Sequence, residues 1–565
     1  MLETKEIKTG IDIESVGTSY SIEEPADFHT NVDYSKYGET KRKLETRHIS
    51  LMIIGQSIGV GLFVGVSSPL MTSGSLSLFL GFVIYAVFMI WVLMQCTGEM
   101  CSYLPIKGSF LHFAARFVDP ALGFATTLIY LYTSCMFVCL EAVSVALVIK
   151  FWTDVNSGVF ITICLVCYFF FNIYGVNWYG EIEFFSAMLK VLLIVGLMLF
   201  GLISMCGGNP KHDAYGFQNW KEGGLFRPYL KEGSLGNFLG WWNVFIFAAL
   251  ACGGPDLLAM VSGEIRNPRK NIALASKNAY IRIYLFYFGG IFFMNTLCSS
   301  TNPGLEDAIK KGQAGAAASP WVIGIRNVGV HGLDSLVNAL IMSSGFSCGN
   351  AFFYGATRTA YSAGLAGYLP RFFCKCLKNG APIYCVVFTS LISCFAYLSI
   401  SNSTANVFNW FVNLSTTGIL CTYICMWITY FKFRIALKAQ GVDINSDSYP
   451  YFKVAKWLTP FTYFGFFINV MVLLCNGFWI FFPGQFTVAN LFTSYFAPVL
   501  FVFLFIFWKI FKKTKYRSGL EADITSGKKE IDEEELLDIE YEENHPRKTG
   551  FWYNVWYKFS DFCFN

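Results

Sequence analysis

The chain has 565 residues, of which 54% are hydrophobic, 18% aromatic and only 14% charged. Average soluble domains carry roughly 25% charged residues. Together with a mean hydropathy of +0.47, the composition predicts an all-α polytopic membrane protein and excludes a string of soluble domains. The formal net charge of +4 is small and indicates no nucleic acid partner.

Twelve stretches are long and apolar enough to be membrane-spanning helices. Residues 1–47 form a polar N-terminal tail that lacks the apolar core of a signal peptide, residues 48–511 form one domain of spanning helices, and residues 512–565 form a C-terminal tail. The predicted spans are about 48–72, 75–97, 121–149, 158–176, 184–206, 238–262, 279–300, 333–363, 382–401, 405–431, 459–482 and 491–511.

Lysine and arginine are concentrated in alternate loops. The basic run Lys41-Arg42-Lys43 precedes the first span, and the loops after spans 6, 8 and 10 are also basic, whereas the loops after spans 1, 9 and 11 have no Lys or Arg. Basic loops stay in the cytoplasm. This pattern predicts that both termini are cytoplasmic.

The first span contains an unusual density of glycine, with Gly55, Gly59, Gly61 and Gly65 in mid-course. Each interior glycine weakens a helix by about 1 kcal/mol, and backbone leaves the helix at membrane depth only where protein or water satisfies it. We therefore interpret residues 57–61 as a broken helix that lines a cavity. Close helix packing through Gly-x-x-x-Gly spacings is the alternative.

A second interruption occurs in span 6, where Gly253-Gly254-Pro255 lies near the middle. Proline removes a backbone donor and clashes with the preceding turn. Spans 1 and 6 begin two consecutive sets of five helices, and paired interruptions in corresponding helices indicate a ligand-binding cavity. Half-helix N-termini favour an anion and C-termini a cation, so a small zwitterion such as an α-amino acid fits both.

Three ionisable residues lie inside predicted spans: Lys190 in span 5, Asp256 after the span 6 break and Glu141 in span 3. Such residues are functional candidates because they are costly to bury. All three are predicted to take part in proton exchange. The structural alternative is that Lys190 pairs with a carboxylate or caps carbonyls of the broken span 1. Glu99 is expected to be a gate or loop-anchoring group.

Several patterns argue against other chemistry. The run from Gly345 to Gly349 matches G-x-S-x-G, but it lies within span 8, and the only later histidine is His545, so no hydrolase is expected. Within this run and after it, Ser347 and Asn350 are expected to line the cavity or bond between helices. Cys164 and Cys167 lack further ligands for a metal. No Walker A or H-E-x-x-H motif occurs, so no enzyme, metal or cofactor is predicted.

The sequence resembles fungal amino-acid permeases, the yeast amino acid transporter family of the amino acid–polyamine–organocation superfamily. The resemblance covers roughly residues 41–515 and rests on IGQSIGVGLFVG, GEM-x₂-YLP-x₂-GSF, YGEIEFFSAMLK, RNPRKNI and SCGNAFFYGATRTAYSAGLAGYLPRFF. It implies twelve helices in a LeuT-like 5+5 inverted repeat plus two, with helices 1 and 6 broken. It also implies import of an amino acid across the fungal plasma membrane by proton symport, with the proton gradient in place of a cofactor.

Carried over residue by residue, the resemblance implies a binding site at the two breaks. The substrate carboxylate meets the backbone around Gly59, Val60 and Gly61. The substrate ammonium meets carbonyls near Ser57, Ile58, Leu250 and Gly253, beside Gly254. Lys190 falls on the span 5 lysine linked to proton coupling in related transporters, and the selecting side chains are expected on spans 3, 6, 8 and 10.

Two alternatives stay open. One is an amino-acid sensor of the same fold, although such sensors carry a much longer N-terminal extension. The other is a transporter of carnitine or polyamines, because Gly208 to Phe217 and the Gly254-Pro255-Asp256 variant of span 6 are most similar to that subgroup. Besides the amino acid and the lipid bilayer, a ubiquitin ligase or other trafficking machinery is the expected partner of the tails.

Overall fold

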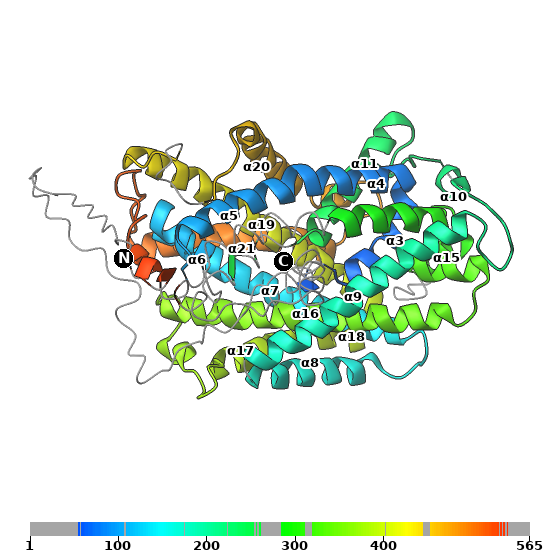
Figure 1. Cartoon of the computed structure of the whole chain (residues 1–565), viewed down its shortest axis with the longest axis horizontal. Helices are drawn as coiled ribbons and strands as arrows, with labels where there is room; N and C mark the ends of the chain where they lie inside the picture. Colours follow the sequence, from blue (N-terminus) through cyan, green and yellow to red (C-terminus); the bar gives the residue numbers. More distant parts are fainter. Residues whose placement is uncertain are drawn as a thin grey trace, which may run out of the picture.

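The computed structural model describes residues 55–540, except positions 57, 107–108, 175, 223, 254–255, 257–258, 261–283, 311–318, 402, 445–451, 530, 534 and 537–539. Within this part of the chain the regular structure is helical, and Cys376 and Pro382 form an isolated bridge. Figure 1 shows long helices running side by side along the longest axis of the molecule. The membrane protein predicted from composition is therefore built from helices.

Among the described residues, nine helical segments are long and apolar enough to cross a membrane. Each corresponds to a predicted span. They are α4 to α5 (Ser75–Tyr103), α7 (Pro120–Ile149), α9 (Val176–Met205), α11 (Gly233–Ala251), α16 (Leu333–Leu365), α17 to α18 (Ile383–Ser393 and Leu398–Ser401), α19 (Thr404–Ala439), α20 (Thr459–Leu474) and α21 (Val488–Lys512).

The other three predicted spans are shorter in the described chain. Helix α8 (Ser157–Ile173) and the helix Tyr284–Leu297 are apolar but short, and the predicted range 279–300 includes undescribed positions. The first span begins before the described residues and appears as η1 (Gly61–Gly65) followed by α3 (Ser67–Ser73).

Some predicted boundaries were wrong. Helix α5 continues to Tyr103, so Glu99 lies inside the helix and is buried, whereas the prediction ended this span at residue 97. Helix α20 ends at Leu474 instead of 482, because the chain turns at Cys475 to Gly477 before a short 3₁₀ segment at Phe478–Phe481. Apolar aromatic residues extend the hydropathy signal past the true end of that helix.

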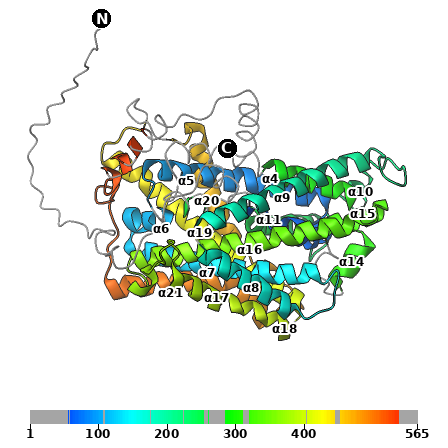
Figure 2. The same ribbon diagram turned by 60° about the horizontal axis from the view of Figure 1, so that its bottom comes forward.

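Helix α7 is the centre of the bundle, with 89% of its most apolar window buried, compared with 17% for α21. It packs against α16 and α19, and α16 runs beside α9 in both ribbon views (Figures 1 and 2). Small residues allow the close approach. A Cβ added at Gly418 of α19 would lie 2.2 Å from Thr133 Oγ1 of α7.

The start of α7 is defined by local chemistry. Asp119 is its N-cap, and the Ala121 amide donates to Asp119 Oδ1 at 2.7 Å. Pro120 occupies the first turn, where a missing amide costs nothing. This capping fixes where α7 enters the bundle and hence the height of Glu141 along it.

Part of the predicted C-terminal tail lies against the helices. After α21 ends, the Arg517 amide donates to the Val118 carbonyl at 2.9 Å and the Asp523 amide to the Arg116 carbonyl at 3.2 Å. Ala522 and Ile524 are buried. Residues 514–529 therefore continue the folded domain beyond residue 511.

Candidate functional site

The backbone of the first span departs from a regular helix at Ile58 and Gly59. Gly55 and Gln56 are helical, and after Val60 the chain winds into the π-helical turn η1. Such turns are rare and occur often at functional sites. The departure lies where the glycine-rich sequence predicted it.

Side chains of α9 and α16 donate hydrogen bonds to backbone carbonyl groups of the first span at this break. Helix termini leave carbonyls without intrahelical partners, and inside a membrane they need donors. The donors are Lys190 Nζ to the Gly55 carbonyl (2.5 Å), Cys348 Sγ to the Gln56 carbonyl (3.3 Å) and Ser344 Oγ to the Ile58 carbonyl (2.9 Å). The structural alternative for Lys190, that it caps a carbonyl of the first span, is thus observed.

Two glycines of the break allow buried carboxylates to approach the backbone. A Cβ at Gly55 would lie 2.0 Å from Glu183 Oε1, and a Cβ at Gly59 would lie 2.6 Å from Glu141 Oε1. No side chain larger than hydrogen fits there without movement of these acids. The glycines therefore serve close approach between helices as well as the break itself.

The second interruption follows α11. This helix ends at Ala251, and Cys252 and Gly253 are not helical. The Tyr287 hydroxyl donates to the Ala251 carbonyl at 2.5 Å. Gly254, which was predicted to line the site, lies outside the described residues, as does Ser57 on the first span.

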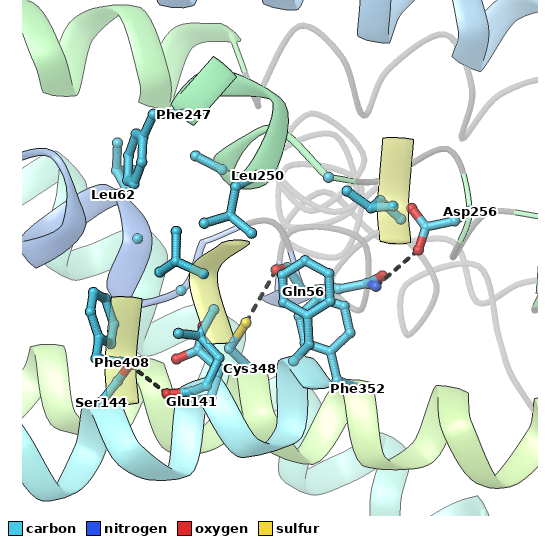
Figure 3. A pocket seen from close by; sticks show the side chains of 18 of the residues that line it. Gln56, Leu62, Glu141, Ser144, Phe247, Leu250, Asp256, Cys348, Phe352 and Phe408 are labelled. Carbon is cyan, nitrogen blue, oxygen red and sulfur yellow. Dashed lines mark hydrogen bonds between the residues drawn. The ribbon is translucent and has the colours of Figure 1, made fainter. Parts of the chain in front are cut away.

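Asp256 connects the two interruptions. Its carboxylate is buried and accepts hydrogen bonds from Gln56 Nε2 at 3.1 Å, from the Tyr130 hydroxyl at 2.9 Å and from the Tyr423 hydroxyl at 3.4 Å. Figure 3 shows Gln56 and Asp256 facing each other beside Phe352. The acid thus joins the first span, α7 and α19 through one carboxylate.

A cavity of about 40 Å³ lies between the interruptions. This volume holds a few water molecules, so an amino acid enters only if the lining side chains move. Besides both breaks, the lining comes from α7, α11, α16 and α19, which are the predicted spans 3, 6, 8 and 10. The lining residues are Gln56, Gly59, Gly61, Leu62, Phe137, Leu140, Glu141, Ser144, Phe247, Leu250, Ala251, Gly253, Asp256, Cys348, Phe352, Phe408, Val412, Ile419 and Tyr423.

The structure separates the predicted site residues into two groups. Gly59, Gly61, Leu250, Gly253, Glu141 and Asp256 line the cavity. Ile58 and Val60 are buried beside it, and the Val60 side chain lies against Gly345 of α16. Lys190 is buried and contacts Gly55 rather than the cavity.

Glu183 lies one residue before the predicted start of span 5 at residue 184 and was not among the predicted site residues. Its side chain is fully buried, and Ser347 Oγ donates to its Oε1 at 3.0 Å. Glu183 lies two helical turns before Lys190 on the same face of α9. This i, i+7 spacing from Lys190 was the sequence pattern that could have identified Glu183 as a second charged residue on the same face of the helix. Glu141, Glu183 and Lys190 are called the break cluster below.

The break cluster contains two carboxylate oxygens without hydrogen-bond partners in the described part of the chain, Glu141 Oε2 and Glu183 Oε2. The Val60 amide and the Cys348 thiol lie within hydrogen-bonding reach of the Glu141 carboxylate. Buried polar atoms are normally satisfied. The two free oxygens are thus sites where protons or water can bind.

The G-x-S-x-G run is part of this arrangement. It lies inside helix α16, with Gly345 against Val60 and Gly349 against the Tyr168 hydroxyl. Ser347 donates to Glu183, and Asn350 Oδ1 accepts from Asn172 Nδ2 at 3.1 Å. The predicted bonds between helices are therefore present, on a regular helix instead of the strained turn that a nucleophile needs.

Comparison with known proteins identifies the family. The amino acid permease family model matches residues 48–520. The chain belongs to the amino acid permease family. This permease is 37% identical to the proline-specific permease of Emericella nidulans over 88% of this chain and 90% of that protein. It is 38% identical to the probable proline-specific permease put4 of Schizosaccharomyces pombe over 88% and 90%, and 32% identical to the general amino acid permease AGP2 of Saccharomyces cerevisiae over 88% and 84%.

Membership in the amino acid permease family supports an amino acid as the substrate, and the long apolar helices are suited to a lipid bilayer. The roles predicted for the individual site residues stay predictions. Glu99 contacts the loop before α20, because the Val454 amide donates to its Oε2 at 3.0 Å, and this contact agrees with a loop-anchoring group.

Proposed function

We propose that this permease imports small neutral amino acids, with proline as the type substrate, across the plasma membrane by proton symport and alternating access. The observation that carries the proposal is the cavity between two interrupted helices. Transporters with paired interruptions bind substrate at this place. Twelve spans in a LeuT-like 5+5 inverted repeat plus two, with both termini in the cytoplasm, complete the proposed architecture.

The cavity lining favours a neutral, apolar substrate side chain. Phe137 and Phe352 stack with ring centroids 4.1 Å apart, and Phe247, Phe408 and Ile419 supply further apolar surface. An anionic side chain would lose its hydration there without a compensating cation, since the described lining contains no Lys or Arg. The names of two relatives, both proline-specific permeases, agree with this choice.

We propose backbone partners for the charged ends of the substrate. Amides around Gly59, Val60 and Gly61 suit the carboxylate, and carbonyls near Ile58, Leu250 and Gly253 suit the ammonium. Ser57, predicted to contribute a carbonyl, lies outside the described residues. Glu141, Asp256 and Lys190 are proposed to carry or control the coupled proton. Ubiquitin ligases remain the proposed partners of the tails.

Uptake of radiolabelled L-proline in a permease-deficient yeast strain tests the proposal. We expect accumulation that is faster at an external pH of about 5 than at about 7.5, because symport draws on the proton gradient, with weak competition from lysine and glutamate. Absence of amino-acid uptake despite normal surface delivery would contradict transport and would favour the sensor alternative.

A second candidate is an organic cation such as carnitine or spermidine. The ionisable carboxyl groups that line the cavity are Glu141 and Asp256, and no Lys or Arg is found in the lining within the described chain. Both compounds belong in the uptake panel. Uptake of spermidine or carnitine that exceeds uptake of proline would assign the cavity to cations.

A further inference from the structure

Two residues of α9 approach the same glycine of the broken first span. Lys190 Nζ donates to the Gly55 carbonyl, and Glu183 Oε1 lies so close to the Gly55 Cα that a Cβ would be 2.0 Å away. Glu183 and Lys190 are 0% and 1% exposed. Any change in the charge of Glu183 therefore acts directly on the backbone of the broken helix at Gly55.

Glu141 belongs to the same electrostatic group. The Cys348 thiol of α16 lies among Glu141, Glu183 and Lys190 and interacts with all three. In the described chain, Lys190 is the only cation whose charge acts on either carboxylate. The other titratable groups facing the cluster, Cys348 among them, are neutral in their protonated forms. They are the thiol of Cys348 and the hydroxyls of Tyr168 on α8 and Tyr287 on the helix 284–297. Asp256 lines the same cavity as Glu141, and its carboxylate accepts hydrogen bonds from Gln56 and from the Tyr130 and Tyr423 hydroxyls.

The number of charged groups in the break cluster limits how many protons the cluster can bind. With both carboxylates and the lysine ionised, the cluster carries one negative charge, and with one added proton it is neutral. An uncompensated buried charge is strongly unfavourable. Both carboxylates interact with the same ammonium and with the same thiol, and ionisable groups coupled in this way titrate as one set. The free Oε2 atoms of Glu141 and Glu183 are the places where this proton can reside.

We propose that Glu141 and Glu183 share one exchangeable proton against the Lys190 ammonium, which makes Glu183 a positioning residue for proton coupling. The inference rests on the proposed proton symport and deepens it, because it sets one proton per cluster. On the outward side, water delivers the proton to the cluster. On the inward side, the proton leaves to water, and the negative charge left behind favours the hydrated, open form of the break.

The test uses the full chain reconstituted in liposomes, with L-proline uptake driven by a pH gradient. Glu183→Gln leaves one carboxylate and one ammonium, which balance without a proton. We expect its uptake to change less than about twofold between pH 5 and 7.5, and its accumulation to stop at equal concentrations on both sides. Glu183→Asp keeps the acid and should restore both the pH slope and uphill accumulation.

Further variants separate charge balance from packing. Glu141→Gln combined with Glu183→Gln leaves Lys190 without a counter-charge, and we expect proline exchange to fall more than tenfold below that of either single variant. Adding Lys190→Met makes the cluster neutral again and should recover part of the exchange. Ser347→Ala removes the hydrogen bond to Glu183 without changing any charge, so it should shift the midpoint of the pH profile and keep its slope.

The outcomes that count against the inference differ from those that count against the transport proposal. Wild-type protein that takes up no amino acid at any pH contradicts the transport proposal. Wild-type uptake driven by protons, with an unchanged slope and accumulation in Glu183→Gln, overturns the inference alone. If Glu183→Gln fails to fold, an unchanged pH midpoint in Ser347→Ala overturns it.

Discussion

Among the described residues, two groups of acidic side chains with little exposure to solvent differ in their partners. The first group lies near the ends of α5, α7 and α21, and we call it the end cluster; it consists of Glu99, Asp119 and Asp523. Each of these carboxylates has its own cation. The pairs are Arg434 with Glu99 (2.6 Å), Lys509 with Asp119, and Arg116 with Asp523 (2.8 Å). In the break cluster two carboxylates have one lysine between them and two free oxygens.

This difference in the number of cations distinguishes acids that hold helices together from acids that are suited to exchange protons. A buried ion pair with full hydrogen bonding resists protonation, and loss of one partner is strongly destabilising. A carboxylate with a free oxygen beside a cavity can gain or lose a proton without breaking a pair. The predictions below test whether the two clusters respond differently to substitution.

The largest effect is expected for Gly55→Ala. The added Cβ would lie 2.0 Å from Glu183 Oε1, so the Glu183 carboxylate must leave its place beside Gly55, and uptake should fall more than tenfold. Overpacking of this kind costs about 1–3 kcal/mol. The measurement is initial proline uptake normalised to surface protein.

Gly196→Ala is the matched control for Gly55→Ala. Gly196 lies on α9 with Glu183 and Lys190, and a Cβ there meets no atom within 4 Å. Alanine is the better helix former by about 1 kcal/mol, so uptake should stay normal. Equal losses in both variants would show that Gly55 has no special contact.

Lys190→Met is expected to have the next largest effect. It removes the donor to the Gly55 carbonyl, which costs about 1–3 kcal/mol for the unsatisfied buried group, and leaves Glu141 and Glu183 without a cation. Uptake against a gradient should be lost at every pH while the protein still reaches the membrane. A normal pH profile in this variant would remove Lys190 from the coupling mechanism.

Glu99→Gln should produce the opposite pattern. The amide cannot form the ion pair with Arg434, and we expect a loss of about 1.5–3 kcal/mol of stability, measured as a lower melting temperature of purified protein. The dependence of uptake on pH should keep its slope, because Glu99 lies outside the break cluster. A flattened pH profile would show that the end cluster also takes part in coupling.

The smallest effect is expected for Asp523→Asn in the segment after α21. Burial raises the pKa of Asp523, but the charge of Arg116 and the hydrogen bonds with Ser526 outweigh burial and hold the pKa below its usual range. A depressed pKa means that this carboxylate stabilises docking at neutral pH, and that the contribution is lost as pH falls through the folded-state value.

Asn removes that contribution at every pH. The expected cost is about 1–2 kcal/mol, seen as faster proteolysis of residues 514–529 with little change in uptake. Glu521→Gln is the control, because the Glu521 side chain accepts from the nearby Ser518 amide within the segment. Equal proteolysis of wild type and Asp523→Asn would show that the ion pair does not hold the segment.

The sequence by itself determined the class of protein, most of the spans and the positions of both interruptions. Hydropathy identifies spans because every backbone group in a membrane must be satisfied within a helix. Glycine at residues 55, 59 and 61 marked the first departure from the helix for the same reason. The resemblance added the family, which the comparisons confirm.

Only the tertiary structure decided which side chains meet at the break. Glu183 lies at the edge of a hydropathy window, and its burial depends on Gly55 and Ser347, which are 128 and 164 positions away in the chain. Likewise, the run from Gly345 to Gly349 matches an enzyme motif in sequence, but in the structure it is part of helix α16 and packs against the broken first span. Local patterns record where backbone must bend, but contacts between distant helices decide which buried charges are balanced.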